Sequence, residues 1–348
     1  MSGAEQGYAR VGWDEPARLA PPALGYWAGA LRKLLRNRSA LFSFAVLVLI
    51  VLACAAAPYY ARDVSHTDPF ASNVGGSTMV GGKSVDVLQQ ATNGFGLGLT
   101  PVGPLWRFGP YALGADDQGR DVAARLLYGG RNSLLIGAAS TAICLALATL
   151  TGLVAGFFGG LVDRVISIFL DILWAFPIYL LAISLSIVLI NESLGIGPIQ
   201  LNGSSLALPI LIIGVVYVPY VARPIRGQVL SLRNSEFVLA ATGLGVPRLR
   251  ILWRDVLPNV FSTVIVFAPL MMALNILTEA ALSFLSVGVQ PPAASWGTII
   301  RDGEDLLYTR PMVAIAPGIA IVLTVLALNI LGDGLRDALD PRAKLRVG

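Results

Sequence analysis

The sequence predicts an all-α polytopic membrane protein with six transmembrane helices. Hydrophobic residues make up 55% of the 348 residues and charged residues only 13%, whereas a soluble domain carries about 25% charged residues. Mean hydropathy is +0.71. A helix crosses a bilayer with about 20 consecutive apolar residues, and stretches of that kind lie at about 40–58, 131–158, 165–190, 205–223, 256–286 and 311–332.

The basic residues predict the orientation of these spans. If both termini are cytoplasmic, 17 of the 25 Lys and Arg residues lie on the inside and 8 on the outside. Cytoplasmic loops of membrane proteins carry an excess of Lys and Arg, so this orientation is favoured. The same bias explains the net charge of +4, and we therefore expect no nucleic-acid partner.

The predicted spans divide the chain into five parts. The external part is rich in Gly, Ser, Pro and Thr, and its short apolar runs fit a small hairpin or a loose loop. Asp121 and Arg125 are expected to pair at i, i+4 on an interfacial helix near its end. The parts are a cytoplasmic tail 1–24, a basic lead-in with the first span 25–58, the external segment with the interfacial helix 59–130, the membrane core 131–335 and a cytoplasmic tail 336–348.

The chain carries no pattern for a metal, a cofactor or catalysis. His66 is its only histidine, and one histidine without partners does not make a zinc site. Gly82-Lys83-Ser84 ends like a phosphate-binding loop, but that pattern requires glycine where Ser77 stands. Cys54 and Cys144 lie inside predicted spans, where a small apolar role is expected. We therefore expect no cofactor, no metal and no enzymatic activity.

The internal segment 234–259 predicts two short helices joined by a turn. Asn234 or Ser235 can cap the first helix, in which Glu236 lies near the positive end of the dipole. Gly245 and Pro247 break that helix. Apolar residues spaced i, i+3, i+4 and i+7 form one narrow stripe that suits a groove on another protein: Phe237, Ala240, Ala241 and Leu244.

This segment resembles the cytoplasmic EAA loop of ABC importer permeases, by which such subunits grip their ATPase. The resemblance covers the stripe, the basic second helix and the start of the following span. It implies that the ATPase-coupling residues are Glu236, Phe237, Ala240, Ala241, Leu244, Gly245, Arg248, Arg250, Leu257 and Pro258.

Motifs on both sides narrow the resemblance. Leu113-Gly114-Ala115-Asp116-Asp117-Gln118-Gly119-Arg120-Asp121-Val122, Ser295-Trp296-Gly297 and Leu331-Gly332-Asp333-Gly334-Leu335 are similar to segments of the C-type permease subunit of oligopeptide, dipeptide or nickel ABC importers. The resemblance covers roughly 25–58 and 111–342. It implies a type I ABC importer permease fold, with an external insert after the first transmembrane helix.

The resemblance also implies a function and a set of partners. It places the chain in the plasma (inner) membrane of a bacterium or archaeon, where it forms half of a path for di- or oligopeptides. The other half is a second homologous permease subunit, a solute-binding protein outside delivers the peptide, and two cytoplasmic ATPase subunits bind ATP and Mg. Import of nickel or another small solute by the same machinery is the alternative.

Several residues within the spans are candidates for packing or for the solute path. Gly152, Gly156 and Gly160 recur every four residues, a spacing that lets another helix approach closely. Asp171 and Glu279 are acids inside spans, where charges are costly and mark functional sites. We interpret each acid either as part of the solute path or gate, or as a partner in a helix-to-helix hydrogen bond.

Two other classes of membrane protein compete with this interpretation. An ion-coupled secondary transporter typically shows related halves and broken helices with polar groups near the membrane centre. This sequence shows no clear internal repeat and only two embedded acids. A purely structural membrane protein has no need of an Arg-bearing helix-turn-helix in an internal loop. The importer permease therefore explains more of the sequence than either alternative.

Overall fold

Among the residues that the structure describes, four helices are long and apolar enough to cross a membrane, and the number rises to six if each of two bent pairs is one span. The bends are 90° between Gly160–Ala175 and Ile178–Leu189, and 42° between Ala207–Val216 and Val218–Arg233. The predicted tail 1–24 and most of 336–348 lie outside the described residues. The computed structural model describes residues 26–90, 98–190, 194–196, 199–201 and 205–339.

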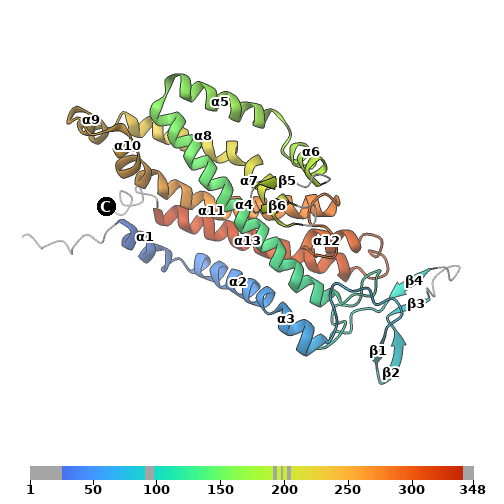
Figure 1. Ribbon diagram of the computed structural model, residues 1–348. Coiled ribbons are helices and arrows are strands. Elements are labelled where there is room, and N and C mark those ends of the chain that lie inside the picture. The colour runs from blue at the N-terminus through green and yellow to red at the C-terminus, as the bar shows by residue number, and fades with distance from the viewer. Residues whose placement is uncertain (1–25, 91–97, 191–193, 197–198, 202–204, 340–348) are drawn as a thin grey trace, which may run out of the picture.

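The helices form an elongated bundle, and the described ends of the chain lie at the same end of it as α9 and α10 (Figure 1). The two ends of a chain lie on the same side of a membrane when the chain crosses it an even number of times. In chain order the helices are α1 (Tyr26–Leu34), α2 (Arg38–Ala55), α3 (Ala57–Tyr59), the π-helical turn η1 (Tyr60–Ser65), α4 (Val122–Phe158), α5 (Gly160–Ala175), α6 (Ile178–Ile190), α7 (Ala207–Val216), α8 (Val218–Arg233), α9 (Glu236–Gly243), α10 (Arg248–Ile251), the π-helical turn η2 (Leu252–Val256), α11 (Leu257–Phe284), α12 (Trp296–Asp302) and α13 (Met312–Leu339).

Two helices continue well beyond the apolar stretches that predicted them. The fourth span was expected to end near residue 223, but α8 extends to Arg233. Its extension is amphipathic, with Ile225 and Val229 buried while Ser231 and Arg233 are exposed, so the helix continues after the apolar run ends. The 37 residues of α4 span about 55 Å, more than the roughly 30 Å of a bilayer core. The expected interfacial helix is therefore the outer end of α4.

The described part of the chain also contains three small antiparallel hairpins, two of them in the external segment. The turn between β1 and β2 has Gly81 and Gly82 at φ +59° and +82°, as a tight two-residue hairpin turn requires. The phosphate-loop-like Gly82-Lys83-Ser84 is thus part of this hairpin. The pairs are β1 (Ser77–Val80) with β2 (Lys83–Asp86), β3 (Leu88–Gln90) with β4 (Leu99–Pro101), and β5 (Leu194–Ile196) with β6 (Ile199–Leu201).

The core of the bundle is the close contact between α4 and α8. A β-carbon on Gly152 would lie 2.9 Å from the carbonyl oxygen of Ala222, and one on Gly156 would lie 2.8 Å from the Cβ of Val229. The two helices therefore touch through backbone, as small residues in membrane helices permit. Gly160, the third glycine of the expected series, does not belong to this contact. Nothing lies within 4 Å of its added β-carbon, and its φ of +58° serves the turn into α5.

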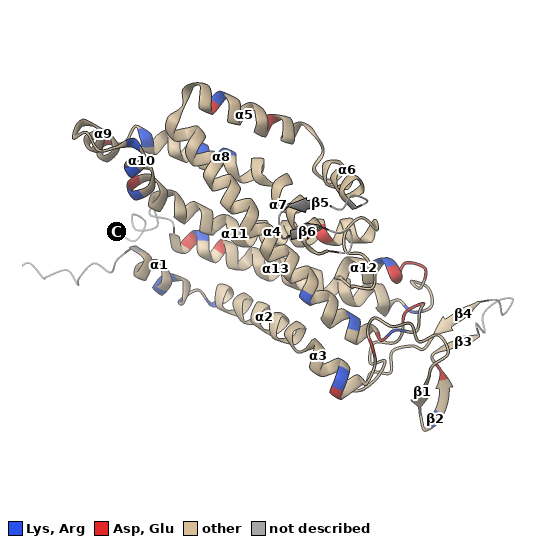
Figure 2. Cartoon of the chain, viewed as in Figure 1, with Lys and Arg blue, Asp and Glu red and all other residues tan. Residues whose placement is uncertain are grey.

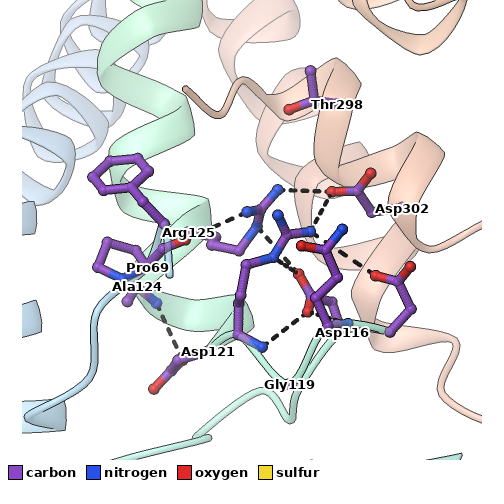
Figure 3. A network of polar contacts seen from close by, with 12 residues as sticks. Pro69, Asp116, Gly119, Asp121, Ala124, Arg125, Thr298 and Asp302 are labelled. Carbon is purple, nitrogen blue, oxygen red and sulfur yellow. Dashed lines mark hydrogen bonds and ion pairs between the residues drawn. The ribbon is translucent and has the colours of Figure 1, made fainter. Parts of the chain in front are cut away.

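A buried ionic network joins the external segment to the bundle (Figure 3). The Arg125 guanidinium donates to Asp302 of α12 at 2.7 Å, and Arg120 donates to the same carboxylate oxygen at 2.9 Å. Arg120 also donates to Asp116 at 2.7 Å. The side chains of Arg120 and Arg125 are 8% and 2% exposed. Two buried cations thus depend on carboxylates from two distant parts of the chain.

The expected pair between Asp121 and Arg125 is absent from this network, so that prediction was wrong. Asp121 caps α4 instead: its Oδ1 accepts from the backbone N–H groups of Ala123 and Ala124, and its Oδ2 from that of Tyr111. Burial raises the pKa of Asp121, while these N–H groups act in the opposite direction. The carboxylate is engaged by backbone, so Arg125 finds its partners elsewhere.

Replacing Gly156 by Leu tests the helix contact. The side chain would collide with Val229 and the backbone of α8, so we expect a loss of about 1–3 kcal/mol of stability, seen as a lower temperature of unfolding in detergent. Gly227→Leu is the matched control because nothing lies within 4 Å of its added β-carbon. Equal stability of the two variants would contradict a backbone contact between α4 and α8.

Replacing Asp302 by Asn tests the outer network. The change removes a carboxylate shared by two buried guanidinium groups, and removing one partner of a buried pair costs about 3–5 kcal/mol. We expect faster proteolysis of the external segment in membranes. Asp305→Asn, at an exposed acid nearby, provides the control. Wild-type protease resistance of Asp302→Asn would show that the network does not hold the external segment.

Candidate functional site

The internal segment 234–259 folds as α9, α10 and η2, which lie at one end of the bundle (Figure 1). Two short helices joined by a turn were predicted here, and that prediction is confirmed. The segment is anchored to the core by apolar side chains. Val238 of α9, Ile251 of α10 and Val256 of η2 are each at most 3% exposed and belong to the same apolar cluster as Val229 of α8.

The end of α9 is fixed by backbone hydrogen bonds. The N–H of Gly245 donates to the carbonyl of Thr242, and the N–H of Val246 donates to that of Ala241. Gly245 has φ +76°, the left-handed conformation that glycine adopts after many helices. The beginning of α9 differs from the expectation, because the hydroxyl of Ser235 donates to the carbonyl of Leu232 and caps no helical N–H. Asn234, the other expected cap, lies one residue before Ser235.

Three of the four residues of the predicted apolar stripe face away from the bundle, while Ala241 packs against the apolar core cluster. Phe237 is 44% exposed and Leu244 is 84% exposed. Ala240 is also exposed, while Ala241 is half-buried. An exposed apolar ridge on a loop that is fixed from behind is the arrangement expected of a docking surface for another protein.

Charged residues surround this stripe. Glu236 lies in the first turn of α9 and is exposed. Arg248 and Arg250 are exposed on α10, and Figure 2 shows basic residues at this helix. At the start of α11, Leu257 is half-buried and Pro258 is exposed. We call the ten residues of the predicted coupling set the coupling surface: Glu236, Phe237, Ala240, Ala241, Leu244, Gly245, Arg248, Arg250, Leu257 and Pro258.

Glu279 lies inside the bundle and is fully buried. Its carboxylate accepts hydrogen bonds from the hydroxyl of Ser133 on α4 at 2.8 Å and from that of Ser283 at 2.7 Å. The Ser133 oxygen also accepts from the backbone N–H of Trp296, at the start of α12. Glu279 thus joins three helices by hydrogen bonds. In this conformation its carboxylate is not accessible to a solute.

Asp171 is in a different setting, on the exposed surface of α5. Its side chain is 66% exposed and forms an ion pair with Arg223 of α8 at 2.8 Å. Arg223 also lies over the ring of Trp174, 5.1 Å from the centroid. The sequence did not single out Arg223 or the neighbouring pair of Arg226 with Asp163. The signal for these ion pairs in the sequence was the spacing of their residues. Asp163 and Asp171 lie eight residues apart, and Arg223 and Arg226 lie three residues apart.

Two adjoining cavities lie where the segment 59–130 meets residues 290–302. The larger has a volume of about 610 Å³ and is bordered by Phe70, Tyr128 and Arg131. The second has a volume of about 410 Å³ and is bordered by Arg120, Arg125 and Asp302 of the outer network. Among the residues with described positions, no group of three or more His, Cys, Asp or Glu side chains is placed to hold a metal.

Comparison with protein families identifies two matching regions. Residues 148–345 match the family described as binding-protein-dependent transport system inner membrane component. Residues 25–75 match the N-terminal transmembrane domain of oligopeptide transport permease C. The first match includes α5 to α13 and the whole coupling surface. The second includes the first transmembrane helix.

Curated relatives cover most of the chain. The oligopeptide transport system permease protein OppC of Haemophilus influenzae is 34% identical over 91% of this chain and 88% of its own length. OppC of Bacillus subtilis is 32% identical over 94% and 93%. The glutathione transport system permease protein GsiD of Pectobacterium atrosepticum is 39% identical over 67% and 73%.

Among solved structures, an inward-facing form of the MetNI methionine ABC transporter aligns with 62% of this chain and 96% of its own chain, at 18% identity and a TM-score of 0.49. The first transmembrane helix, α5 to α13 and the coupling surface lie within the residues that match the family models. The family matches and these relatives show that the chain belongs to the family of binding-protein-dependent transport system inner membrane components, as a multi-pass ABC importer permease.

Proposed function

We propose that this chain is a non-catalytic permease subunit that forms half of the path of an ATP-driven peptide importer. A second, homologous permease subunit supplies the other half. An external solute-binding protein delivers the peptide, and two cytoplasmic ATPase subunits bind ATP and Mg. This chain binds neither, since its sequence has no complete phosphate-binding loop.

The observation that carries this proposal is the exposed apolar stripe on the coupling surface. Val238 and Ile251 fix the loop to the core from behind, while Phe237 and Leu244 project outward. A rigid loop transmits the movement of a bound partner, and exposed apolar side chains stabilise the contact when the partner buries them. The ATPase is the partner that an importer permease needs on this side of the membrane.

Peptides are the solute class that the relatives favour. Their names specify oligopeptides, dipeptides and glutathione, which is itself a tripeptide. No observation on this chain favours nickel over a peptide. Selectivity is shared with the solute-binding protein, so the permease supplies a path compatible with peptides.

We further propose that both termini and the coupling surface are cytoplasmic and that the membrane is the plasma (inner) membrane of the cell. The distribution of Lys and Arg supports this orientation. The position of α9 and α10 at the same end of the bundle as α1 also supports it (Figure 1). The outer network and the two cavities then face the solute-binding protein.

Replacing Leu244 by Glu tests the coupling surface. Leu244 is 84% exposed, so the change should leave the fold intact while placing a charge in the interface, and a buried unpaired charge is strongly unfavourable. We expect the ATPase subunits to dissociate during purification and peptide uptake to fall at least tenfold.

Leu244 is a cleaner position than Gly245, where a side chain would also strain a backbone at φ +76°. Met79→Glu is the control, at an apolar residue that is 53% exposed on the external hairpin. Retention of the ATPases and normal uptake by Leu244→Glu would refute docking through this stripe.

Uptake by the reconstituted complex tests the solute class and the energy source. We expect a labelled tripeptide to enter vesicles only when ATP and a solute-binding protein are present, and radioactive nickel not to enter. Import driven by a proton or sodium gradient without ATP would instead identify an ion-coupled secondary transporter.

A further inference from the structure

The helix α5 is held to the bundle along one narrow face. Of its residues Gly160–Ala175, Leu170 alone is classed as buried. Leu161, Val165 and Phe169 are 74%, 59% and 58% exposed on other faces. Its junction with α6 bends by 90° at Phe176-Pro177. With so little apolar burial, the contacts that α5 does make determine how it is positioned.

Two ion pairs link this face of α5 to α8. The guanidinium of Arg226 donates to both carboxylate oxygens of Asp163, with a distance of 2.7 Å from Nη2 to Oδ2. Arg223 donates to Asp171 at 2.8 Å. The acids lie eight residues apart on α5 and the arginines three apart on α8, so each helix presents its two charges to the other. The pairs form two successive links between antiparallel helices.

Aromatic contacts extend the link between Asp171 and Arg223. The Trp174 ring of α5 stacks on Tyr220 of α8, with centroids 6.1 Å apart. The Arg223 guanidinium lies over the same Trp174 ring. A cation over an aromatic ring is attracted by its negative face. The ion pair and the stacked rings therefore constrain the end of α5 next to its bend.

The helix α8 also leads directly into the coupling surface. Its last residue, Arg233, is followed within three residues by the first residue of α9. The hydroxyl of Ser235 donates back to the carbonyl of Leu232 in α8. A side chain on Gly159 would lie 2.7 Å from Arg233 Nη1, so Arg233 covers the turn that begins α5. Movement of α9 is thus conveyed to a helix that is bonded to α5.

The exposure of Asp171 and Arg223 indicates what this face of α5 adjoins. Their side chains are 66% and 42% exposed in the single chain, within the bent pairs that make up the third and fourth spans. Charged groups at membrane depth face a protein interior or a water-filled cavity, because contact with lipid is strongly unfavourable. This face therefore adjoins the solute path or the second permease subunit.

We propose that α5 is a wall of the solute path and that the coupling surface moves it through α8, with the Asp163–Arg226 and Asp171–Arg223 ion pairs as the links. The inference rests on the proposed function and names the residues that carry movement from the ATPase to the path. Arg223 and Arg226 are positioning residues, since they act by holding α5.

Charge reversal at the link between Asp163 and Arg226 tests this inference in the assembled transporter. Asp163→Arg and Arg226→Asp each place like charges together, so we expect uptake to fall about tenfold in each single variant. The double variant restores an ion pair with exchanged signs and should recover to within about threefold of wild type. ATPase assembly and basal hydrolysis should persist in all three variants, because neither residue belongs to the coupling surface.

The control is Arg164→Asp. Arg164 is an exposed neighbour for which no ion pair is found among the described residues, and its reversal should leave uptake unchanged. Wild-type uptake by both single variants would overturn the inference. It would also be overturned if the assembled double variant were as impaired as the single variants. If the wild-type permease did not assemble with the ATPase subunits, or if the solute did not stimulate ATP hydrolysis by the complex, the proposed function itself would be refuted.

A distance measurement tests the inference without charge reversal, so it remains informative if the reversed variants fail to fold. Spin labels at Val165 of α5 and Ser231 of α8, both exposed, would be placed in protein whose two buried cysteines are replaced by alanine. We expect the same interspin distance with and without ATP in the complex, since the two helices move together. A distance in the unreversed protein that changes with ATP would contradict the links.

Discussion

The structure depends on the contact between α4 and α8. Gly152 and Gly156 have no side chain, so the backbones of the two helices approach until a single added carbon would collide with Val229 or with a carbonyl oxygen. Helices in a bilayer gain little from the hydrophobic effect when they associate, and close packing is their main source of stability. This contact gives α8 a fixed position in the core. The coupling surface and α5 are both attached to α8.

The ionic groups on the two sides of the bundle have different settings. In the network around Asp302, the side chains of Arg125 and Asp302 are 2% and 12% exposed, and with Arg120 they join the external segment to α12. Between α5 and α8, the side chains of Asp171 and Arg223 are 66% and 42% exposed, so this ion pair contributes less to stability on its own than a buried pair does. The position of α5 therefore depends on its two ion pairs and on the stacked rings of Trp174 and Tyr220 acting together.

Much of the fold could be predicted from the sequence, because membrane spans require long apolar runs and the coupling stripe has a helical period. The bends and the ionic partners could not. The apolar run 165–190 predicted one continuous span, whereas the structure bends it by 90° between Ala175 and Ile178. Arg125 pairs with Asp302, 177 residues away, whereas spacing along one helix pointed to Asp121. Glu279 was recognised as unusual, and only the fold shows its hydrogen bonds to Ser133 and Ser283.

Electron cryomicroscopy of the assembled transporter with and without ATP would test most directly whether α8 connects the ATPase to the membrane core. We predict that the stripe of α9 is buried against an ATPase subunit in both states. We also predict that α4, α5, α8 and α9 superpose as one body while the rest of the complex rearranges around them. Structures in which α9 contacts no ATPase, or in which α8 shifts along α4 at Gly152 and Gly156, would contradict this role.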